Sequence, residues 1–420
     1  MITKQKGTYD VIGMDAKKRK YVCDVIDAIC EKYNYNYIET PIFESSELFH
    51  RSVGETSDIV TKETYDFIDR GNRNITLRPE GTAGVVRSFI ENKMYGNMSE
   101  PVKVYYNGPM FRYERPQSGR TRQFTQFGFE VIGTDDVISD AEVISLAYNT
   151  YKLLGINPKV NINTLGDNES RDNYRKALIE YFKPTIDELC EDCKSRLDKN
   201  PLRILDCKVD ANSEILKNAP KTIDYLNEES KLRFEKLLEY LELMEIDYEV
   251  NTNLVRGLDY YNHTVFEITA DIPDFGAQSV LGGGGRYNGL VEQLDGPSIP
   301  AIGFAMGLDR TILAMESLNV NFKIKDNIDI FIMYGNEEEK ETATYLIQDL
   351  RMNGFICDTD YMGKSFKNQF KSADRFNAKY LIILNSDDIK NFQVKLKDNE
   401  TKEEELVNIN DLVDHLDMKF

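Results

Sequence analysis

The chain has 420 residues, of which 71 are Asp or Glu and 52 are Lys or Arg, so its formal net charge is −19. This length predicts two or three domains. So acidic a chain excludes a protein that coats nucleic acid through bulk positive charge, and any nucleic-acid partner must meet locally basic surface. No apolar run approaches the roughly 20 residues that span a bilayer, and the first residues lack the apolar core of a secretory signal. We therefore expect a cytoplasmic protein with no membrane partner.

The first expected elements are a helix and several strands. Residues 15–33 carry apolar side chains on one helical stripe. Residues 35–44 then form a strand pattern in which Pro41 suits an edge or an interface. Further along, the patterns predict a strand that opens into a helix at 74–84, two strands of a long hairpin at 101–114 and 122–133, and a helix at 141–154.

Four arginines gather in the loop of that hairpin, namely Arg112, Arg115, Arg120 and Arg122, and no lysine accompanies them. Lysine would serve a general attraction to polyanions equally well, whereas the planar guanidinium group suits a phosphate or carboxylate held in a fixed orientation. The loop therefore indicates either a site that orients a specific anion or a solvated loop whose charges bind no ligand.

The second half of the chain changes character twice. Residues from about 170 to 245 are helical and charged, which predicts an inserted helical subdomain. Strand patterns return at 248–270, 279–294 and 301–316. From residue 326 onward strands and helices alternate as βαβαβ, which predicts a small, mostly parallel α/β domain. We expect two domains, at residues 1–325 and 326–420.

Two motifs are better explained by structure than by ligand chemistry. The glycines at 282–285 precede Arg286 and Tyr287 rather than the Lys-Ser/Thr of a P-loop, so we expect a strand position that permits close approach. Cys190, Cys193 and Cys207 supply three sulfur atoms where a structural zinc site needs four ligands, and none of the three histidines is near in sequence. We expect reduced thiols that pack helices, and no bound metal.

Two more arginines, Arg256 and Arg310, occur within strand or helix patterns. An unpaired guanidinium group is costly to bury there, so each needs an anionic partner, either a structural carboxylate or a ligand. With the hairpin arginines and Glu80 they indicate a phosphate-binding cleft with a carboxylate placed to receive an amine. No Ser/His/Asp or Cys/His arrangement is evident, which favours a chemistry without a protein nucleophile.

These residues carry a resemblance to a known family. "GPMFRYERPQSGRTRQFTQFGFEVIG" resembles motif 2 of the class II aminoacyl-tRNA synthetases, "GFAMGLDR" resembles motif 3, and the segment that ends at Pro41 resembles motif 1. "LVRGLDYYNHTVFE" and "GGGGRYNGL" resemble the two signatures of the histidyl-tRNA synthetase family. The resemblance covers nearly the whole chain, and the joint order and spacing of the motifs make it specific.

The resemblance implies an α/β chain with an α+β catalytic domain at 1–325. That domain would hold the class II antiparallel sheet flanked by helices, with a helical insertion at about 170–245. It implies an anticodon-binding α/β domain at 326–420 and a homodimer that meets through motif 1. The implied reaction joins L-histidine to ATP as histidyl-adenylate and then to tRNA(His). Mg²⁺ would bridge the outgoing phosphates and be held largely by the nucleotide itself.

The resemblance also implies roles for individual residues. Arg112 and Arg256 would be catalytic. ATP would meet Arg112 at its α-phosphate, Arg310 at its γ-phosphate, and Arg120 and Arg122 nearby. Histidine would be held by Glu80, Gly81, Thr82, Arg112, Gln126 and Arg256 around its amino and carboxylate groups, and by Glu130, Tyr260 and Tyr261 around its imidazole. tRNA would meet Arg115 and Gln117 at its acceptor end.

A basic helical face adds a second expected tRNA contact. Lys364, Lys367, Lys371 and Arg375 follow one another at spacings of three and four, which places them on one face of a helix. So acidic a chain needs local basic surface to attract phosphates, so we expect Lys367 and Lys371 to lie near the anticodon arm.

Two other functions compete with this interpretation. One is a non-catalytic, histidine-sensing paralogue that resembles the regulatory subunit of ATP phosphoribosyltransferase. The other is a ligase that makes an amino-acid adenylate without tRNA. The presence of Arg112, Arg256 and Arg310 counts against the first, and the α/β unit at 326–420 counts against both. Thr125 departs from the family pattern, which often has histidine there, and this leaves the shape of the nucleotide side open.

Overall fold

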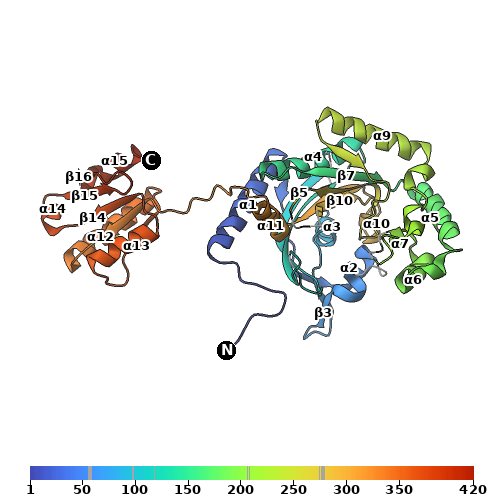
Figure 1. Ribbon diagram of the computed structural model, residues 1–420, viewed down its shortest axis with the longest axis horizontal. Coiled ribbons are helices and arrows are strands. Elements are labelled where there is room, and N and C mark those ends of the chain that lie inside the picture. Colours follow the sequence, from blue (N-terminus) through green and yellow to red (C-terminus); the bar gives the residue numbers. More distant parts are fainter. Residues whose placement is uncertain are drawn as a thin grey trace. The chain divides into compact units, whose positions relative to one another are not determined.

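The computed structural model describes residues 1–54, 59–96, 99–117, 119–205, 207, 209–273, 275 and 280–420. Contacts divide the chain into two compact units, Met1–Phe322 and Lys323–Phe420 (Figure 1). Among the helices in the described part of the chain, none is both long and apolar enough to cross a bilayer.

Unit 1 is built on an eight-stranded sheet in the order β1-β5-β6-β11-β10-β9-β7-β8. Its strands are β1 (Asn36–Tyr37), β5 (Val102–Phe111), β6 (Gln123–Ile132), β11 (Ala301–Gly307), β10 (Val280–Arg286), β9 (Asn262–Thr269), β7 (Lys159–Thr164) and β8 (Tyr248–Val250). All neighbours pair antiparallel except the two edge pairs, β1 with β5 and β7 with β8. This confirms the predicted fold class and the predicted hairpin of β5 and β6.

Three helices cover the sheet: α1 (Gly13–Lys32), α4 (Val137–Leu153) and α11 (Leu308–Ser317), and α1 contacts both of the others. Stacked rings form part of the core, since Phe304 lies 5.7 Å from Phe129 and 5.6 Å from Phe266, measured between ring centroids. A Cβ atom at Gly282 would lie 2.5 Å from the Phe304 ring. The glycine run therefore makes room for this stack, as the sequence predicted for a close-approach position.

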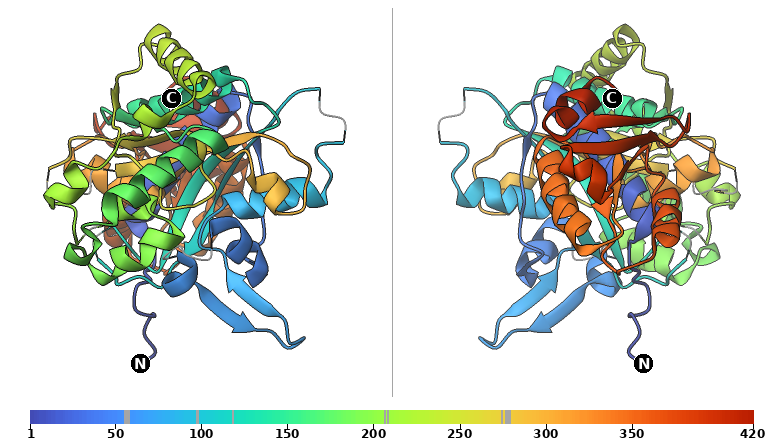
Figure 2. Two further views of the ribbon diagram at one scale, coloured as in Figure 1. Left: turned by 90° about the vertical axis from the view of Figure 1, so that its right-hand side faces the viewer. Right: turned by 90° about the vertical axis from the view of Figure 1, so that its left-hand side faces the viewer.

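A smaller sheet, in the order β2-β4-β3, stands beside α2 (Ser46–Val53) and α3 (Thr82–Glu91). Its strands are β2 (Phe43–Ser45), β4 (Asn74–Leu77) and β3 (Tyr65–Ile68), and the blue strands project from the body of unit 1 in Figure 2. The prediction of one strand at 35–44 was wrong, because β1 joins the large sheet and β2 the small one. Pro41, which has no N–H to donate to a ladder, lies exposed between them.

Helices fill the chain between β7 and β8, as the patterns at about 170–245 predicted. They are α5 (Asn168–Phe182), α6 (Glu191–Lys199), α7 (Leu202–Leu205), α8 (Glu214–Lys217) and α9 (Glu228–Leu243). Asp167, Ser213 and Asn227 begin three of them by accepting a backbone N–H. This insertion has its own core, which includes Tyr174 and Cys193. The expectation that its cysteines only pack helices omitted Asp210, whose carboxylate lies beside all three sulfur atoms.

Unit 2 is a five-stranded sheet in the order β13-β12-β14-β15-β16. Its elements are β12 (Ile330–Met333), α12 (Glu337–Met352), β13 (Cys357–Thr359), α13 (Phe366–Arg375), β14 (Tyr380–Ile383), α14 (Ser386–Lys390), β15 (Gln393–Asp398), β16 (Glu404–Asn408) and α15 (Leu412–Asp417). The predicted βαβαβ unit is present and parallel. The sequence analysis missed the antiparallel strands β15 and β16, because both segments carry many charged residues. In the structure these charges pair across the two strands, as Lys397 does with Glu404.

Candidate active site

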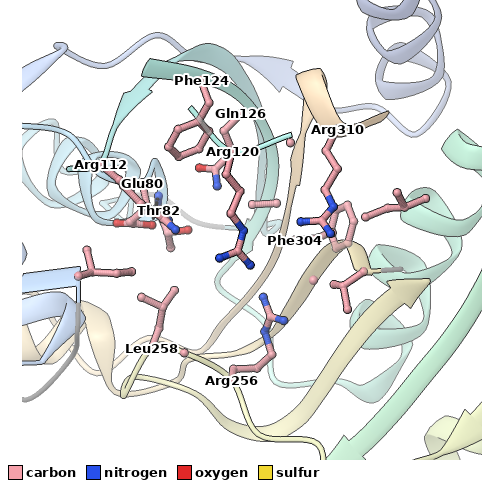
Figure 3. A pocket seen from close by; sticks show the side chains of 18 of the residues that line it. Glu80, Thr82, Arg112, Arg120, Phe124, Gln126, Arg256, Leu258, Phe304 and Arg310 are labelled. Atoms are coloured by element: carbon pink, nitrogen blue, oxygen red, sulfur yellow. Dashed lines mark hydrogen bonds between the residues drawn. The ribbon is translucent and has the colours of Figure 1, made fainter. Parts of the chain in front are cut away.

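A cavity of about 420 Å³ opens in unit 1 where the large sheet meets the start of α3 and the loop before β9. Most of the residues that the family resemblance assigns to ligands line it. Figure 3 labels Glu80, Thr82, Arg112, Arg120, Gln126, Arg256 and Arg310, and the lining also includes Tyr260 and Tyr261. They come from segments as far apart as residues 80 and 310, so the fold itself assembles the site.

Glu80 is fixed at the start of α3. Its two carboxylate oxygens accept the backbone N–H groups of Thr82 and Ala83, each at 2.8 Å. The side chain is 3% exposed, and burial raises its pKa. Gly81 does not line the cavity, but a Cβ atom there would collide with the Tyr106 ring. Glycine at 81 therefore allows Glu80 and Thr82 to face the cavity at this turn.

Glu130 lies on β6, buried just behind the cavity wall. Thr82 donates its hydroxyl to Oε1 at 2.8 Å, and Tyr287 donates to Oε2 at 2.5 Å. A side chain at Gly303 would overlap Oε2, so glycine there makes space for the carboxyl group. Burial raises the pKa of Glu130 to about 8, although these hydrogen bonds oppose the shift.

Aromatic hydroxyl groups complete this end of the site. The rings of Tyr260 and Tyr261 lie 4.7 Å apart, and Tyr260 is 5.6 Å from Tyr287, measured between centroids. All three are buried, and burial raises the pKa of each hydroxyl. The pocket end is therefore flat, aromatic and lined with neutral hydrogen-bonding groups, which suits a small polar ring.

Gln126, also on β6, points into the cavity in Figure 3. Its buried Oε1 accepts no hydrogen bond from any residue in the described part of the chain. A buried amide oxygen almost always has a partner, so this atom indicates a ligand that donates N–H or O–H at this point.

Three guanidinium groups converge across the middle of the cavity, from Arg120, Arg256 and Arg310 (Figure 3). Arg120 lies in the hairpin loop, 3.6 Å from Glu114, and Arg310 lies on α11 near the Phe275 ring. Burial lowers the pKa of Arg310, and the positive charge of Arg120 adds to this effect. So much positive charge in one place favours a polyanionic ligand.

Arg256 forms an ion pair with Glu267 of β9. The prediction that it lies within a strand was wrong, since it belongs to the loop between β8 and β9. Arg112 sits at the opposite wall, where its Nε donates to the carbonyl of Pro79 at 2.9 Å and its guanidinium packs 5.3 Å from the Phe124 ring. These contacts hold both guanidinium groups at the cavity surface.

Some expected residues are not brought to the cavity. Arg122 turns away from it, with its guanidinium 3.8 Å from the centroid of the Tyr113 ring and its Nε donating to the carbonyl of Glu114. Arg115 and Gln117 are exposed on the hairpin loop, outside the cavity lining. Gln117 pairs through its backbone with Arg120, which shapes the loop.

Several lining residues were not predicted, and two of them, Arg203 and Asp309, make polar contacts that shape the site. Arg203, from α7 of the insertion, donates to Asp259 at 3.2 Å and to the carbonyl of Gly257 at 2.6 Å. Asp309 accepts from Tyr9 and Arg19, and also from the backbone of Thr125 at 3.0 Å. Arg203 lies outside every quoted motif. Asp309 lies within "GFAMGLDR", but its partners Tyr9 and Arg19 are about 290 residues or more away in the sequence, so the motif alone did not reveal its contacts. Thr125 accepts from Arg19 at 2.5 Å, and this pair occupies the position that departs from the family pattern.

The basic face predicted in unit 2 is only partly helical. Lys367, Lys371 and Arg375 are exposed on α13, but Lys364 precedes the helix and donates to Ser372 at 2.9 Å. Lys371 and Arg375 line a shallow depression with Lys364, and Lys367 stands outside it.

Comparison with known proteins agrees with this geometry. Residues 7–311 match the family model described as histidyl-tRNA synthetase, and residues 329–419 match the model described as anticodon binding domain. The chain belongs to the histidyl-tRNA synthetase family. It is 50% identical over 412 residues to the histidine–tRNA ligase of Anoxybacillus flavithermus, covering 98% of this chain and 97% of that protein.

Other members of the family are similar over the whole length. The histidine–tRNA ligase of Staphylococcus haemolyticus is 48% identical, with both chains fully covered. The crystal structure of apo histidyl-tRNA synthetase from S. aureus has a TM-score of 0.86 at 43% identity, covering 99% of this chain and 100% of that one. The family therefore extends through both units.

Proposed function

We propose that the chain is a histidine–tRNA ligase, which activates L-histidine with ATP and transfers it to tRNA(His). The observation that carries this proposal is one cavity whose lining combines Arg112, Arg256 and Arg310 with Glu80. Glu130 is buried behind the wall of that cavity, where it accepts the hydroxyl of Thr82. Phosphate-binding and amine-binding groups are thus within reach of one bound adenylate.

Histidine would occupy the end of the cavity near α3. Its ammonium group would lie against Glu80, Thr82 and the open Oε1 of Gln126. Its imidazole would lie against Glu130, Tyr260 and Tyr261, where a hydrogen-bonding wall rejects apolar isosteres strongly. The carboxylate would then face Arg256 and Arg112, ready to attack the α-phosphorus of ATP.

The chemistry needs charge stabilisation and alignment rather than a protein nucleophile. As the carboxylate oxygen bonds to the α-phosphorus, the bond to pyrophosphate breaks and negative charge grows on the phosphoryl oxygens. Arg256 and Arg112 would stabilise that charge at the α-phosphate, and Arg310 with Arg120 would hold the outer phosphates. The terminal ribose hydroxyl of tRNA would next attack the adenylate carbonyl and release AMP.

Mg²⁺ fits this site only as an ion carried by the nucleotide. Three of the four lining carboxylates already meet protein donors: Glu80 meets the start of α3, Asp309 meets Arg19, and Glu114 faces Arg120. When bound with ATP, the ion would neutralise the outer phosphates and favour departure of pyrophosphate. The protein's share is to orient the phosphates through its arginines.

The tRNA and the second subunit would contact surfaces outside the cavity. Arg115 and Gln117 are exposed on the hairpin loop, and Lys367 and Lys371 are exposed on α13, so all four side chains are accessible to a partner. Apolar side chains at the motif 1 segment are also exposed, with Ile42 at 43% and Phe43 at 59%. We propose a homodimer through this segment. All six cysteines are free thiols, which fits the reducing cytoplasm.

Histidine-dependent ATP–pyrophosphate exchange tests the catalytic assignment. Arg256→Ala should lower exchange by at least about a hundredfold, because it removes a donor aimed at the charge that develops on the α-phosphate. Arg51→Ala, which removes an arginine from a surface pair with Asp295, is the matched control and should retain normal exchange. A histidine-sensing paralogue would bind histidine without catalysing exchange in any variant.

A further inference from the structure

Four metal-ligating side chains meet in the helical insertion, away from the candidate active site. Cys190 immediately precedes α6, Cys193 lies in its first turn, Cys207 follows α7, and Asp210 lies just beyond. One ligand atom of each residue lies within 4.8 Å of all the others. Cys193 and Cys207 are buried, with exposures of 0% and 4%, so the cluster is closed to bulk solvent on that side.

Two ligand–ligand distances in the cluster match a tetrahedral zinc site, and the remaining ones are no longer than 4.8 Å. Bond lengths of about 2.3 Å to sulfur and about 2.1 Å to oxygen place two ligands of a tetrahedron roughly 3.8 Å apart for two sulfurs and roughly 3.6 Å apart for sulfur and oxygen. The Sγ atoms of Cys190 and Cys207 lie 3.6 Å apart, and Sγ of Cys207 lies 3.5 Å from Oδ2 of Asp210. Each of these two distances lies within about 0.2 Å of the tetrahedral value.

Backbone N–H groups within the cluster orient two of its four ligand groups. The N–H of Cys190 donates to Oδ2 of Asp210 at 3.0 Å, and the N–H of Asp210 donates to Sγ of Cys207 at 3.4 Å. Outer-sphere hydrogen bonds of this kind orient ligands at metal sites. Neither a disulfide nor simple packing explains the set, because a disulfide would leave one thiol over and packing does not need a carboxylate among three sulfurs.

We propose that Cys190, Cys193, Cys207 and Asp210 bind one structural zinc ion. The thiolates and the carboxylate give a closed four-ligand set, with no position left for substrate. The ion would therefore brace the insertion rather than take part in the reaction.

The braced segment reaches the candidate active site. Between Cys193 and Cys207 the chain carries Asn200 and Arg203, which both donate to Oδ1 of Asp259, at 3.0 and 3.2 Å. Arg203 also holds the carbonyl of Gly257, the neighbour of Arg256. Zinc would hold the two ends of this segment together, and Arg203 would act as a positioning residue for the Arg256 loop. This second part rests on the proposed function, whereas zinc binding does not.

Metal content of the untagged full-length chain tests the site directly. Chain purified under reducing conditions with micromolar zinc and then desalted should hold about one zinc per chain by inductively coupled plasma mass spectrometry. Replacement by Co²⁺ should give the intense visible bands of a tetrahedral ion and a thiolate-to-cobalt charge-transfer band. Cys207→Ser and Cys193→Ser should each lose at least about tenfold in metal affinity. Cys357→Ser, at a buried cysteine of unit 2, should lose none.

Asp210→Asn keeps the size of the side chain and addresses the fourth ligand. It should weaken zinc binding and shift the cobalt spectrum while the chain stays folded by circular dichroism. The site is refuted if the wild-type chain retains no zinc and shows no cobalt bands, or if the metal survives in Cys207→Ser. The zinc site would also be refuted if mass spectrometry of the chain, kept under reducing conditions, showed the loss of two hydrogens that marks a Cys190–Cys207 disulfide. None of these measurements depends on aminoacylation.

Discussion

Replacing Gly283 with alanine tests the position of Arg256 without removing it. A Cβ atom at Gly283 would lie 2.6 Å from Cζ and both terminal nitrogens of the Arg256 guanidinium. Ordinary contact begins at 3.4 Å, so the group must move by about 0.8 Å. The colliding atoms end a flexible side chain and the backbone at Gly283 is not left-handed, so the fold itself should accept the methyl group.

That displacement is large on the scale of catalysis. Moving a catalytic group by about 1 Å typically costs on the order of a hundredfold in rate, and it would also disturb the ion pair of Arg256 with Glu267. We expect Gly283→Ala to lower kcat for histidine-dependent pyrophosphate exchange by about fiftyfold to a hundredfold. The free energy of unfolding should change by less than about 1 kcal/mol. Gly289→Ala is the control, because nothing lies within 4 Å of its Cβ position.

The double variant Gly283→Ala/Arg256→Ala decides how the methyl group acts. If it acts by moving the guanidinium, the double variant should be no slower than Arg256→Ala, because the two changes disable the same group. If the losses multiply and the KM for ATP rises, the methyl group obstructs the nucleotide itself. That result, or normal exchange in Gly283→Ala, would refute the placement of Arg256 at the reacting phosphate.

Three further predictions concern pH, tRNA and assembly. The pKa of Glu130 is raised to about 8, so the folded chain holds a proton that the unfolded chain releases. Relative to Glu130→Gln, the wild-type free energy of unfolding should therefore fall from about pH 5 to pH 8 and level off above it. If urea titrations give the two proteins the same dependence of this free energy on pH, the prediction is wrong. Lys367→Glu/Lys371→Glu should raise the KM for tRNA and reduce the slope of log binding constant against log salt concentration by up to about two. Pyrophosphate exchange should be unchanged. Lys390→Glu/Lys402→Glu is the charge-matched control. Phe43→Asp should shift the chain from dimer toward monomer in analytical ultracentrifugation, and a wild-type chain that is fully active as a monomer would rule the interface out.

Local patterns predicted the elements that local patterns govern. The β5–β6 hairpin, the helical insertion and the parallel core of unit 2 follow from periodicity and turn residues in single segments. The paired strands β15 and β16 escaped because cross-strand pairs such as Lys397 with Glu404 form only after the register is set. The segment 35–44 was also mispredicted because local pattern does not show strand pairing: β1 pairs in the large sheet and β2 in the small one.

The sequence predicted the site residues that belong to a recognisable motif. It did not predict the contacts that form only when distant segments pack together. The resemblance brought Glu80, Arg256 and Arg310 together, and the cavity contains all three. It also included Arg122, which the fold turns onto Tyr113 instead. Asp210 was overlooked because a carboxylate three residues beyond a cysteine carries no signal until the loop closes. Long-range contacts of this kind are set by tertiary packing.

Charging of tRNA(His) with labelled L-histidine tests the central claim most directly. The wild-type chain, with ATP and Mg²⁺, should attach labelled histidine to tRNA(His) and not to a tRNA that is specific for another amino acid. Arg256→Ala should attach at least about a hundredfold less per unit time, and Arg51→Ala should match the wild type. Histidine binding without any charging would contradict the account and identify a histidine sensor, and pyrophosphate exchange without charging would identify an adenylate-forming ligase that does not use tRNA.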